Sequence, residues 1–235
     1  VQAILEHEAT GDFYEVLPDY IYRCGGDAVW RSTNWGEPPL HIRSVTVDYS
    51  SREGCTVCGY DEELASGLKD EILSSGKNKV LIVLHTSTSH GPSYNQKYPA
   101  EFERFTPVCT SVELSKCSQN ELFNAYDNSI IYTDCILSKV IDELKSLDGW
   151  KSCMLFVSDH GESLGEKNLY MHGVPLNMAP KEQYEIPFIA WVSDSSRVMK
   201  TLPEVSQHHV FHSVVDFLSL DTPVLDRSLS IFEQR

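Results

Sequence analysis

Three histidines and one aspartate stand where polar segments follow apolar runs of the sequence: His90, Asp159, His160 and His172. The polar sequence HTSTSHGP follows one run, DHGESLGE follows a second, and YMHGVP comes shortly downstream. In open α/β sheets, ligand-binding residues gather beyond the carboxyl ends of the strands. The four side chains therefore form a candidate site whose chemistry depends on imidazole and carboxylate groups.

Asp159 and His160 are adjacent at a predicted strand end, where the backbone turns and both side chains can address one metal ion or two neighbouring ions. A carboxylate oxygen beside an imidazole nitrogen suits Zn²⁺, with Mn²⁺ as an alternative. Gly161 would let the backbone pass close to this site. In the competing interpretation, Asp159 caps a following helix and His160 is a surface histidine. The apolar run before the pair and the sequence GESLGE after it favour the metal interpretation.

His90 and His172 are the candidate catalytic residues. His90 precedes Gly-Pro in a run of hydroxyl side chains, and His172 lies in the tight loop sequence MHGVP. A lone loop histidine is often structural, but the position of His90 beyond a strand end favours a contact with substrate or metal. An imidazole at such a position can hold a phosphate oxygen or move a proton.

Continuous apolar runs predict the strands that position these residues. The run 79–85 (KVLIVLH) suits a strand buried on both faces of a parallel sheet. Residues 152–158 and 186–192 form similar runs, and 28–31 is a shorter candidate. Two of the polar segments therefore begin where the predicted strands 79–85 and 152–158 end, and the third lies shortly downstream.

Helical spacing of apolar residues predicts helices between the strands. Ser118 and Glu121 form an S-x-x-E capping box before a long periodic segment. Further helices are predicted over 62–73 and from near residue 206. Strand–helix–strand alternation predicts a layered α/β domain with a largely parallel sheet. No domain boundary is visible, so residues 1–235 are expected to form a single domain.

The composition excludes several classes of function. The 235 residues include 34 acidic and 19 basic side chains, which gives a formal charge of −15. This balance argues against nucleic acid as a partner, because nucleic-acid-binding domains usually present a basic face. No apolar run approaches the roughly 18–20 residues of a membrane span, and the first residues lack the pattern of a signal peptide. A bound cation would let so acidic a domain hold an anionic group.

The cysteines favour an oxidising compartment. Cys55 and Cys58 lie in a Gly/Ser/Thr segment, and Cys109 and Cys117 flank a polar loop. Short-range pairs in loops are typical of disulfides. The alternative for Cys55 and Cys58 is a zinc knuckle, which normally needs two further ligands at similar spacing. Two cysteines in apolar helix and strand patterns are expected to be buried free thiols: Cys135 and Cys153.

Several of these motifs together resemble the lipid A phosphoethanolamine transferases, inner-membrane enzymes that include the mobile colistin-resistance determinants. The resemblance covers most of the chain, and its motifs occur in the family's order. It rests on the segments 81–94 (LIVLHTSTSHGPSY), 97–109 (KYPAEFERFTPVC), 156–166 (FVSDHGESLGE), 170–175 (YMHGVP) and 179–188 (APKEQYEIPF). It implies an alkaline-phosphatase/sulfatase-type fold, an α/β/α sandwich that faces the periplasm.

The resemblance also implies an activity. It implies zinc-dependent transfer of phosphoethanolamine from phosphatidylethanolamine to a phosphorylated or hydroxyl acceptor, with lipid A as the first candidate. The transfer would take place in two steps through a phosphothreonine. The implied location is the inner membrane, with the catalytic domain in the periplasm.

The resemblance assigns roles to the candidate residues by position. Asp159 and His160 correspond to the family's metal-ligand pair. His90 and His172 correspond to histidines around the substrate phosphate or a second zinc ion. Two cysteines correspond to a family disulfide: Cys109 with Cys117.

The family's nucleophile has no counterpart in the sequence. It is a threonine near the start of the catalytic domain, after a strand that ends in a ligand glutamate, and no such pattern occurs before Val16. The chain is therefore expected to be a fragment whose nucleophile and N-terminal membrane anchor lie upstream. Two alternatives are a sulfatase or phosphoglycerol transferase of the same fold, and a non-catalytic periplasmic binding domain. A sulfatase would need Cys or Ser in a C/S-x-P-x-R motif, and no cysteine has that context.

Overall fold

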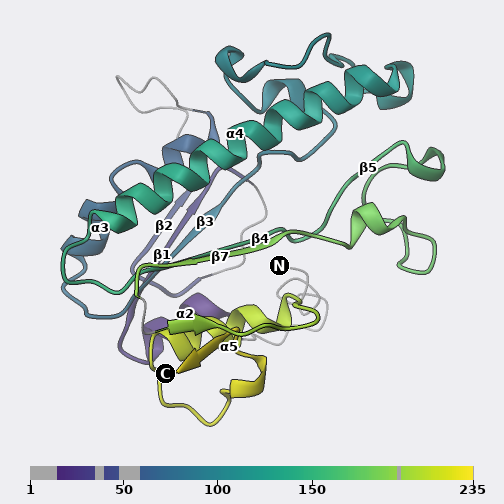
Figure 1. Ribbon diagram of the computed structural model, residues 1–235. Coiled ribbons are helices and arrows are strands. Elements are labelled where there is room, and N and C mark those ends of the chain that lie inside the picture. The colour runs from purple at the N-terminus through teal and green to yellow at the C-terminus, as the bar shows by residue number, and fades with distance from the viewer. Residues whose placement is uncertain (1–14, 35–39, 48–58, 195–196, 235) are drawn as a thin grey trace.

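Strands and helices alternate along the chain, as the sequence predicts (Figure 1). The computed structural model describes residues 15–34, 40–47, 59–194 and 197–234, so Cys55 and Cys58 lie outside the described residues. The helices are α2 (Leu17–Arg23), α3 (Leu68–Ser74), α4 (Gln119–Lys145) and α5 (His208–Phe217). The strands are β1 (Asp27–Ser32), β2 (Ser44–Val47), β3 (Val80–His85), β4 (Cys153–Val157), β5 (Ser163–Leu164), β6 (Tyr170–Met171), β7 (Phe188–Val192), β8 (Arg197–Met199) and β9 (Phe232–Gln234).

A parallel sheet of three strands, in the order β2-β1-β3, supports the site. β1 pairs with β3 over its whole length, so that Ser32 lies opposite His85. The carboxyl ends of β1 and β3 therefore lie together at one edge. The strands predicted at 28–31 and 79–85 are confirmed.

Alternate side chains of β3 face two different helical layers. Ile82 and Leu84 pack into a core with Val140 of α4, whereas Leu81 packs into a core with Val215 of α5. Figure 1 shows α3 and α4 on one side of the strands and α2 and α5 on the other. Successive side chains of a strand point to opposite faces, so one apolar run serves both layers. The predicted α/β fold is confirmed as a layered sandwich.

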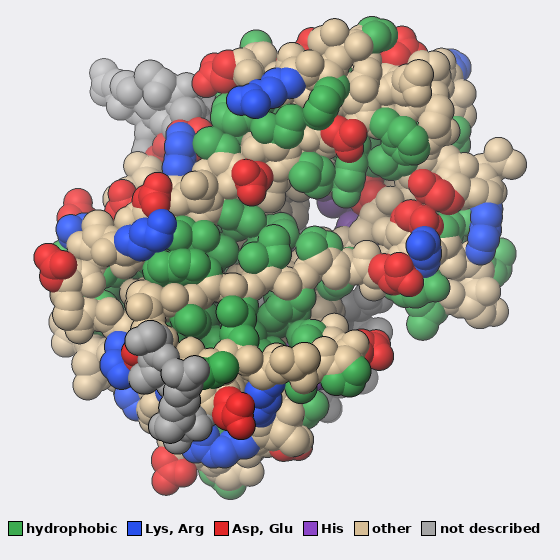
Figure 2. Space-filling view, in the orientation of Figure 1, with side chains coloured by type: hydrophobic (Ala, Val, Ile, Leu, Met, Phe, Trp, Pro, Cys, Tyr) green, Lys and Arg blue, Asp and Glu red, His purple; other side chains and the backbone are tan. Residues whose placement is uncertain are grey.

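β4 and β7 form a separate antiparallel pair, with Leu155 opposite Ala190. The chain leaves β4 at the candidate site, makes an excursion and returns along β7, which gives antiparallel neighbours. The apolar runs predict strands that are buried on both faces, and the structure corrects this prediction. β3 is half-buried throughout, and Met154 is the one buried residue of β4. Among the described residues, β3 pairs only with β1 and β4 only with β7. Hydrophobic side chains accordingly gather at the surface around the β4–β7 pair (Figure 2).

The long helix α4 begins at the predicted capping box. The Glu121 carboxylate accepts a hydrogen bond from the Ser118 backbone N–H at 2.8 Å, and the Ser118 hydroxyl accepts one from the Glu121 N–H at 3.3 Å. These bonds satisfy donors that the first helical turn leaves free. Hydrogen bonds to the Glu121 carboxylate from the Ser118 hydroxyl and from the Ser118 backbone N–H lower the pKa of Glu121. The start of the 27-residue helix is therefore fixed locally.

The single helix predicted over 62–73 is wrong, because the structure divides this segment into two separate elements. The segment Asp61–Ala65 forms a 3₁₀ turn, and α3 starts only at Leu68. Between them Ser66 is extended and Gly67 has a φ of 61°, in the left-handed region. Glycine adopts that conformation at little cost, so the chain turns there and the 3₁₀ segment is directed toward the site.

The described cysteines include one disulfide and three free thiols. Cys109 and Cys117 are bonded, with 5.7 Å between their Cα atoms, which confirms the predicted pair. Cys24 is exposed, whereas Cys135 and Cys153 are half-buried rather than fully buried. Burial raises the pKa of Cys153 to about 12.

We expect Cys153 to be alkylated at least about 100-fold more slowly than Cys24 at pH 8, because the thiolate is the reactive form and burial suppresses it. Timed iodoacetamide labelling followed by peptide mapping measures both rates. The same labelling in denaturant is the control, where the difference should vanish. Equal rates in the folded protein would contradict the burial of Cys153.

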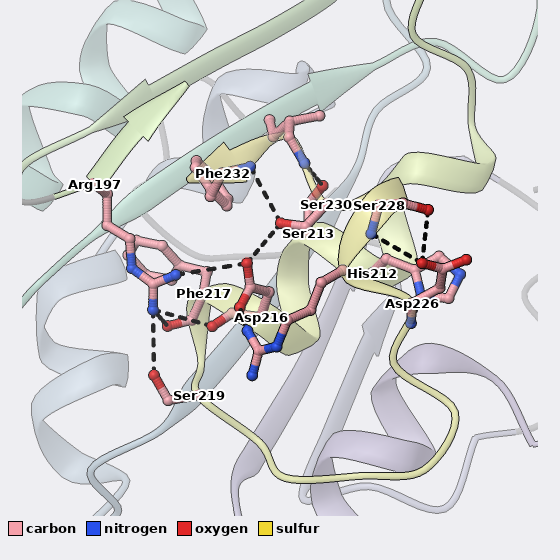
Figure 3. A network of polar contacts seen from close by, with 12 residues as sticks. Arg197, His212, Ser213, Asp216, Phe217, Ser219, Asp226, Ser228, Ser230 and Phe232 are labelled. Carbon is pink, nitrogen blue, oxygen red and sulfur yellow. Dashed lines mark hydrogen bonds and ion pairs between the residues drawn. The ribbon is translucent and has the colours of Figure 1, made fainter. Parts of the chain in front are cut away.

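A polar network ties the C-terminal segment to α5 (Figure 3). The buried Asp216 carboxylate accepts hydrogen bonds from Arg227 and from the hydroxyl of Ser230, and the Ser213 hydroxyl accepts one from the Ile231 N–H at 3.0 Å. The network fixes α5 beside the β8–β9 pair. None of the helices in the described parts of the chain has the length and apolar character needed to cross a membrane.

Candidate metal centre

The loop after β3 carries His90 and is shaped by a buried carboxylate. The side chain of Asp61 accepts hydrogen bonds from the backbone N–H groups of Ser87 at 3.0 Å and Thr88 at 2.5 Å. The hydroxyls of Thr33 and Thr88 also donate to it. Asp61 is only 3% exposed, so these bonds replace water as its partners. The 3₁₀ turn before α3 thereby sets the path of the loop.

The loop after β4 carries Asp159 and His160. It is held by the residue that precedes α5 and by a backbone hydrogen bond from Gly161 to Gln183. The Gln207 side chain donates to the carbonyl oxygens of Ser158 at 2.9 Å and Asp159 at 2.7 Å. A Cβ atom at Gly161 would clash with the carbonyl oxygen of Glu182. Gly161 therefore allows a close backbone approach, as expected, but the group approached is the Glu182 segment.

Three imidazole rings meet between these loops. The ring centroids of His160 and His172 are 3.6 Å apart in a stacked arrangement, and His90 lies 5.1 Å from His172 and 5.9 Å from His160. One ring nitrogen from each histidine lies within 4.8 Å of those of the other two. Figure 2 shows histidine side chains inside a hollow between one end of α4 and the lobe that carries β5. The structure thus gathers three of the four candidate residues into one group.

The hydrogen bonds of the three rings involve Nδ1, which leaves Nε2 of each ring available to bind a metal ion. Nδ1 of His90 and Nδ1 of His160 lie 2.8 and 3.0 Å from the carbonyl oxygen of the glycine that follows each. Nδ1 of His172 lies 3.2 Å from a carboxylate oxygen of Glu162. These oxygens are acceptors, so Nδ1 of each neutral ring donates and Nε2 keeps its lone pair. Three lone pairs on half-buried rings suit a transition-metal cation.

The surroundings of His172 favour its neutral form. Burial lowers its pKa, and the neighbouring His160 and His90 lower it further, while Glu162 acts in the opposite direction. A histidine must be neutral to bind a metal ion. The low pKa therefore keeps His172 available as a ligand at neutral pH.

Asp159 lies beside the three-histidine group. Its Oδ2 atom is 3.7 Å from Nε2 of His160, and its Oδ1 atom accepts from the His160 backbone N–H at 3.0 Å. The side chain is 38% exposed, more than that of His160 at 26%. The Asp159 carboxylate can thus reach an ion bound by His160 from the open side of the site.

Three residues that shape the site have no role in the sequence-based prediction. Glu162 and Tyr94 do fall within the motif segments, at DHGE and HGPSY, and that placement is the only signal that marks them. Asp61 carries no signal, because it directly precedes a segment predicted as helix. Its contacts to the loop after β3 arise only from the fold.

Comparison with known proteins reveals a family and several relatives. A family model described as sulfatase matches residues 30–220. The phosphoethanolamine transferase EptA of Helicobacter pylori is 39% identical over 232 residues, which cover 95% of this chain and 44% of that protein. The chain therefore spans less than half the length of this relative.

Two solved structures share the fold over nearly the whole chain. The C-terminal periplasmic domain of phosphoethanolamine transferase EptC from Campylobacter jejuni superposes with a TM-score of 0.80 at 32% identity, covering 96% of this chain and 73% of that one. The integral membrane protein lipooligosaccharide phosphoethanolamine transferase A from Neisseria meningitidis gives 0.82 at 30% identity, covering 94% and 45%.

Proposed function

Because the chain belongs to the sulfatase family and, within it, to the phosphoethanolamine transferases, we propose that it is the zinc-dependent catalytic part of such a transferase. The donor is phosphatidylethanolamine, and the acceptor is a phosphorylated or hydroxyl group, with lipid A as the first candidate. The observation that carries the proposal is the convergence of three imidazoles whose Nδ1 atoms all face oxygen acceptors.

The residues of the site fit zinc. Imidazole nitrogen and carboxylate oxygen are ordinary zinc ligands. In the proposal, Asp159 and His160 hold the ion, and His90 and His172 contact the substrate phosphate or a second zinc ion. Bound zinc would offset phosphate charge and lower the pKa of the attacking hydroxyl. The cation also explains how a chain of charge −15 receives an anionic headgroup.

The proposed transfer has two steps, with a threonine outside this chain as nucleophile. First, the threonine oxygen bonds to the donor phosphorus while the bond from phosphorus to the glycerol oxygen breaks, and that oxygen takes a proton. Second, an acceptor oxygen bonds to the same phosphorus and releases the threonine. In the proposal, His90 and His172, whose ring centroids lie 5.1 Å apart, orient phosphate oxygens or move these protons.

The proposed location is the periplasmic face of the inner membrane. Two observations support it. The Cys109–Cys117 disulfide suits an oxidising compartment. The related structures are a periplasmic domain and an integral membrane transferase.

The test uses the complete protein that contains this chain, expressed in cells that lack other phosphoethanolamine transferases. Mass spectrometry of extracted lipid A should show the mass of one added phosphoethanolamine group, and a His160→Ala variant should abolish it. Transfer of phosphoglycerol or release of sulfate would instead support one alternative. Zinc binding without any transfer would support a non-catalytic binding domain.

A further inference from the structure

Glu162 is a buried carboxylate that connects the two loops of the site. Its side chain is 4% exposed. The two carboxylate oxygens lie 3.2 and 3.3 Å from the backbone nitrogen of Gly91. One oxygen also faces Nδ1 of His172 at 3.2 Å, and the other accepts from the Tyr94 hydroxyl. The Gly91 N–H and the Tyr94 hydroxyl are donors, and Nδ1 of His172 can also donate when it carries the ring proton, so one carboxylate can satisfy all three.

The loop that carries His90 can approach Glu162 because residue 91 is glycine. A Cβ atom at Gly91 would lie 2.6 Å from the Tyr94 hydroxyl oxygen and 3.0 Å from a carboxylate oxygen of Glu162. The backbone at position 91 therefore approaches Glu162 closely, and a larger residue at that position would push the loop away from the carboxylate. It brings the segment next to His90 against the same carboxylate that bonds His172.

Tyr94 occupies the second oxygen of the carboxylate. Its ring is 1% exposed and packs in the core beside Leu122 and Leu164. Burial raises the pKa of Tyr94, so its hydroxyl keeps the proton and donates it to Glu162. The tyrosine thus holds one oxygen in place while the other faces His172.

We propose that Glu162 is a positioning residue that fixes His172 as the Nδ1–H tautomer and clamps the His90 loop against it, so that the Nε2 lone pairs face a divalent metal cation. A carboxylate that accepts from Nδ1–H of a ligand histidine orients the ring and increases its basicity. The identity of the cation rests on the proposed function. The tautomer and the loop contact depend on this chain alone.

The decisive measurement is the tautomer of His172 in the metal-free chain. Nitrogen-15 NMR of histidine-labelled protein at pH 8 distinguishes a protonated Nδ1 from a protonated Nε2, and a His172→Ala sample assigns the signals. We expect Nδ1–H in the wild type, loss of that preference in Glu162→Ala, and its retention in Tyr94→Phe. The conservative Glu162→Gln keeps an amide oxygen for Nδ1 and should restore the preference in large part.

A matched control separates positioning from loss of stability. Asp27 is equally buried, pairs with Arg43 and lies in the first position of β1, away from the carboxyl ends of the strands. Asp27→Ala should weaken folding and leave the His172 tautomer unchanged. An unchanged tautomer in Glu162→Ala would overturn the inference.

Zinc titration gives a second, separable result. Glu162→Ala should weaken zinc binding by roughly 10- to 100-fold, as for other partners of metal-bound histidines. If the wild type binds no zinc but the tautomer still depends on Glu162, the proposed metal chemistry fails and the positioning role stands. If zinc binds tightly in both proteins and the tautomer does not change, the positioning role fails and the metal proposal stands.

Discussion

Replacing His160 by alanine should weaken zinc binding by more than about 100-fold, because even outer partners of metal ligands contribute roughly 10- to 100-fold. His160 lies next to both of the other histidines and to Asp159. Its ring stacks on His172 at a centroid distance of 3.6 Å, and its Nε2 atom lies 3.7 Å from the Asp159 carboxylate. Its loss removes a proposed ligand that lies next to the other imidazoles and to the carboxylate.

Competition of the purified chain with a chelating dye measures this affinity. His41→Ala is the matched control, since His41 is exposed and precedes β2, at the opposite end of the parallel strands from the site. That variant should bind zinc like the wild type. Asp159→Ala should also lose affinity if the aspartate is a ligand. Unchanged binding in His160→Ala would remove the basis of the metal proposal.

The second large effect concerns folding. Asp61→Ala should lower the free energy of unfolding by about 2–4 kcal/mol, because two backbone N–H groups lose their acceptor and each such loss costs about 1–3 kcal/mol when buried. The groups belong to Ser87 and Thr88, in the loop that leads to His90. Zinc affinity should fall as well, since the same loop places that histidine.

Urea denaturation followed by circular dichroism measures the change in stability. The control is Asp148→Ala, an exposed aspartate just after α4, which should change stability by less than about 0.5 kcal/mol. A loss below about 1 kcal/mol in Asp61→Ala would show that the loop keeps its path without the carboxylate.

The loops that carry the candidate site show how much of that site the local sequence predicts. The apolar runs ending near His85 and Ser158 identify strands because burial on a sheet requires such runs. Polar residues beyond a strand end are candidates for chemistry for an equally local reason. His90, Asp159, His160 and His172 were therefore all identifiable from the sequence. The capping box at Ser118 and Glu121 is likewise local, and it appears as predicted.

The sequence alone determined the alternation of strands and helices, the start of α4 and the residue types of the candidate site, because each depends on spacings within one segment. The tertiary structure decided the antiparallel pairing of β4 with β7, the turn at Gly67 and the grouping of three imidazoles with Asp159 at their edge. It also gave Glu162 and Asp61 their roles. These features depend on contacts between segments far apart in the chain, where position is set by packing and by the need of buried polar groups for partners.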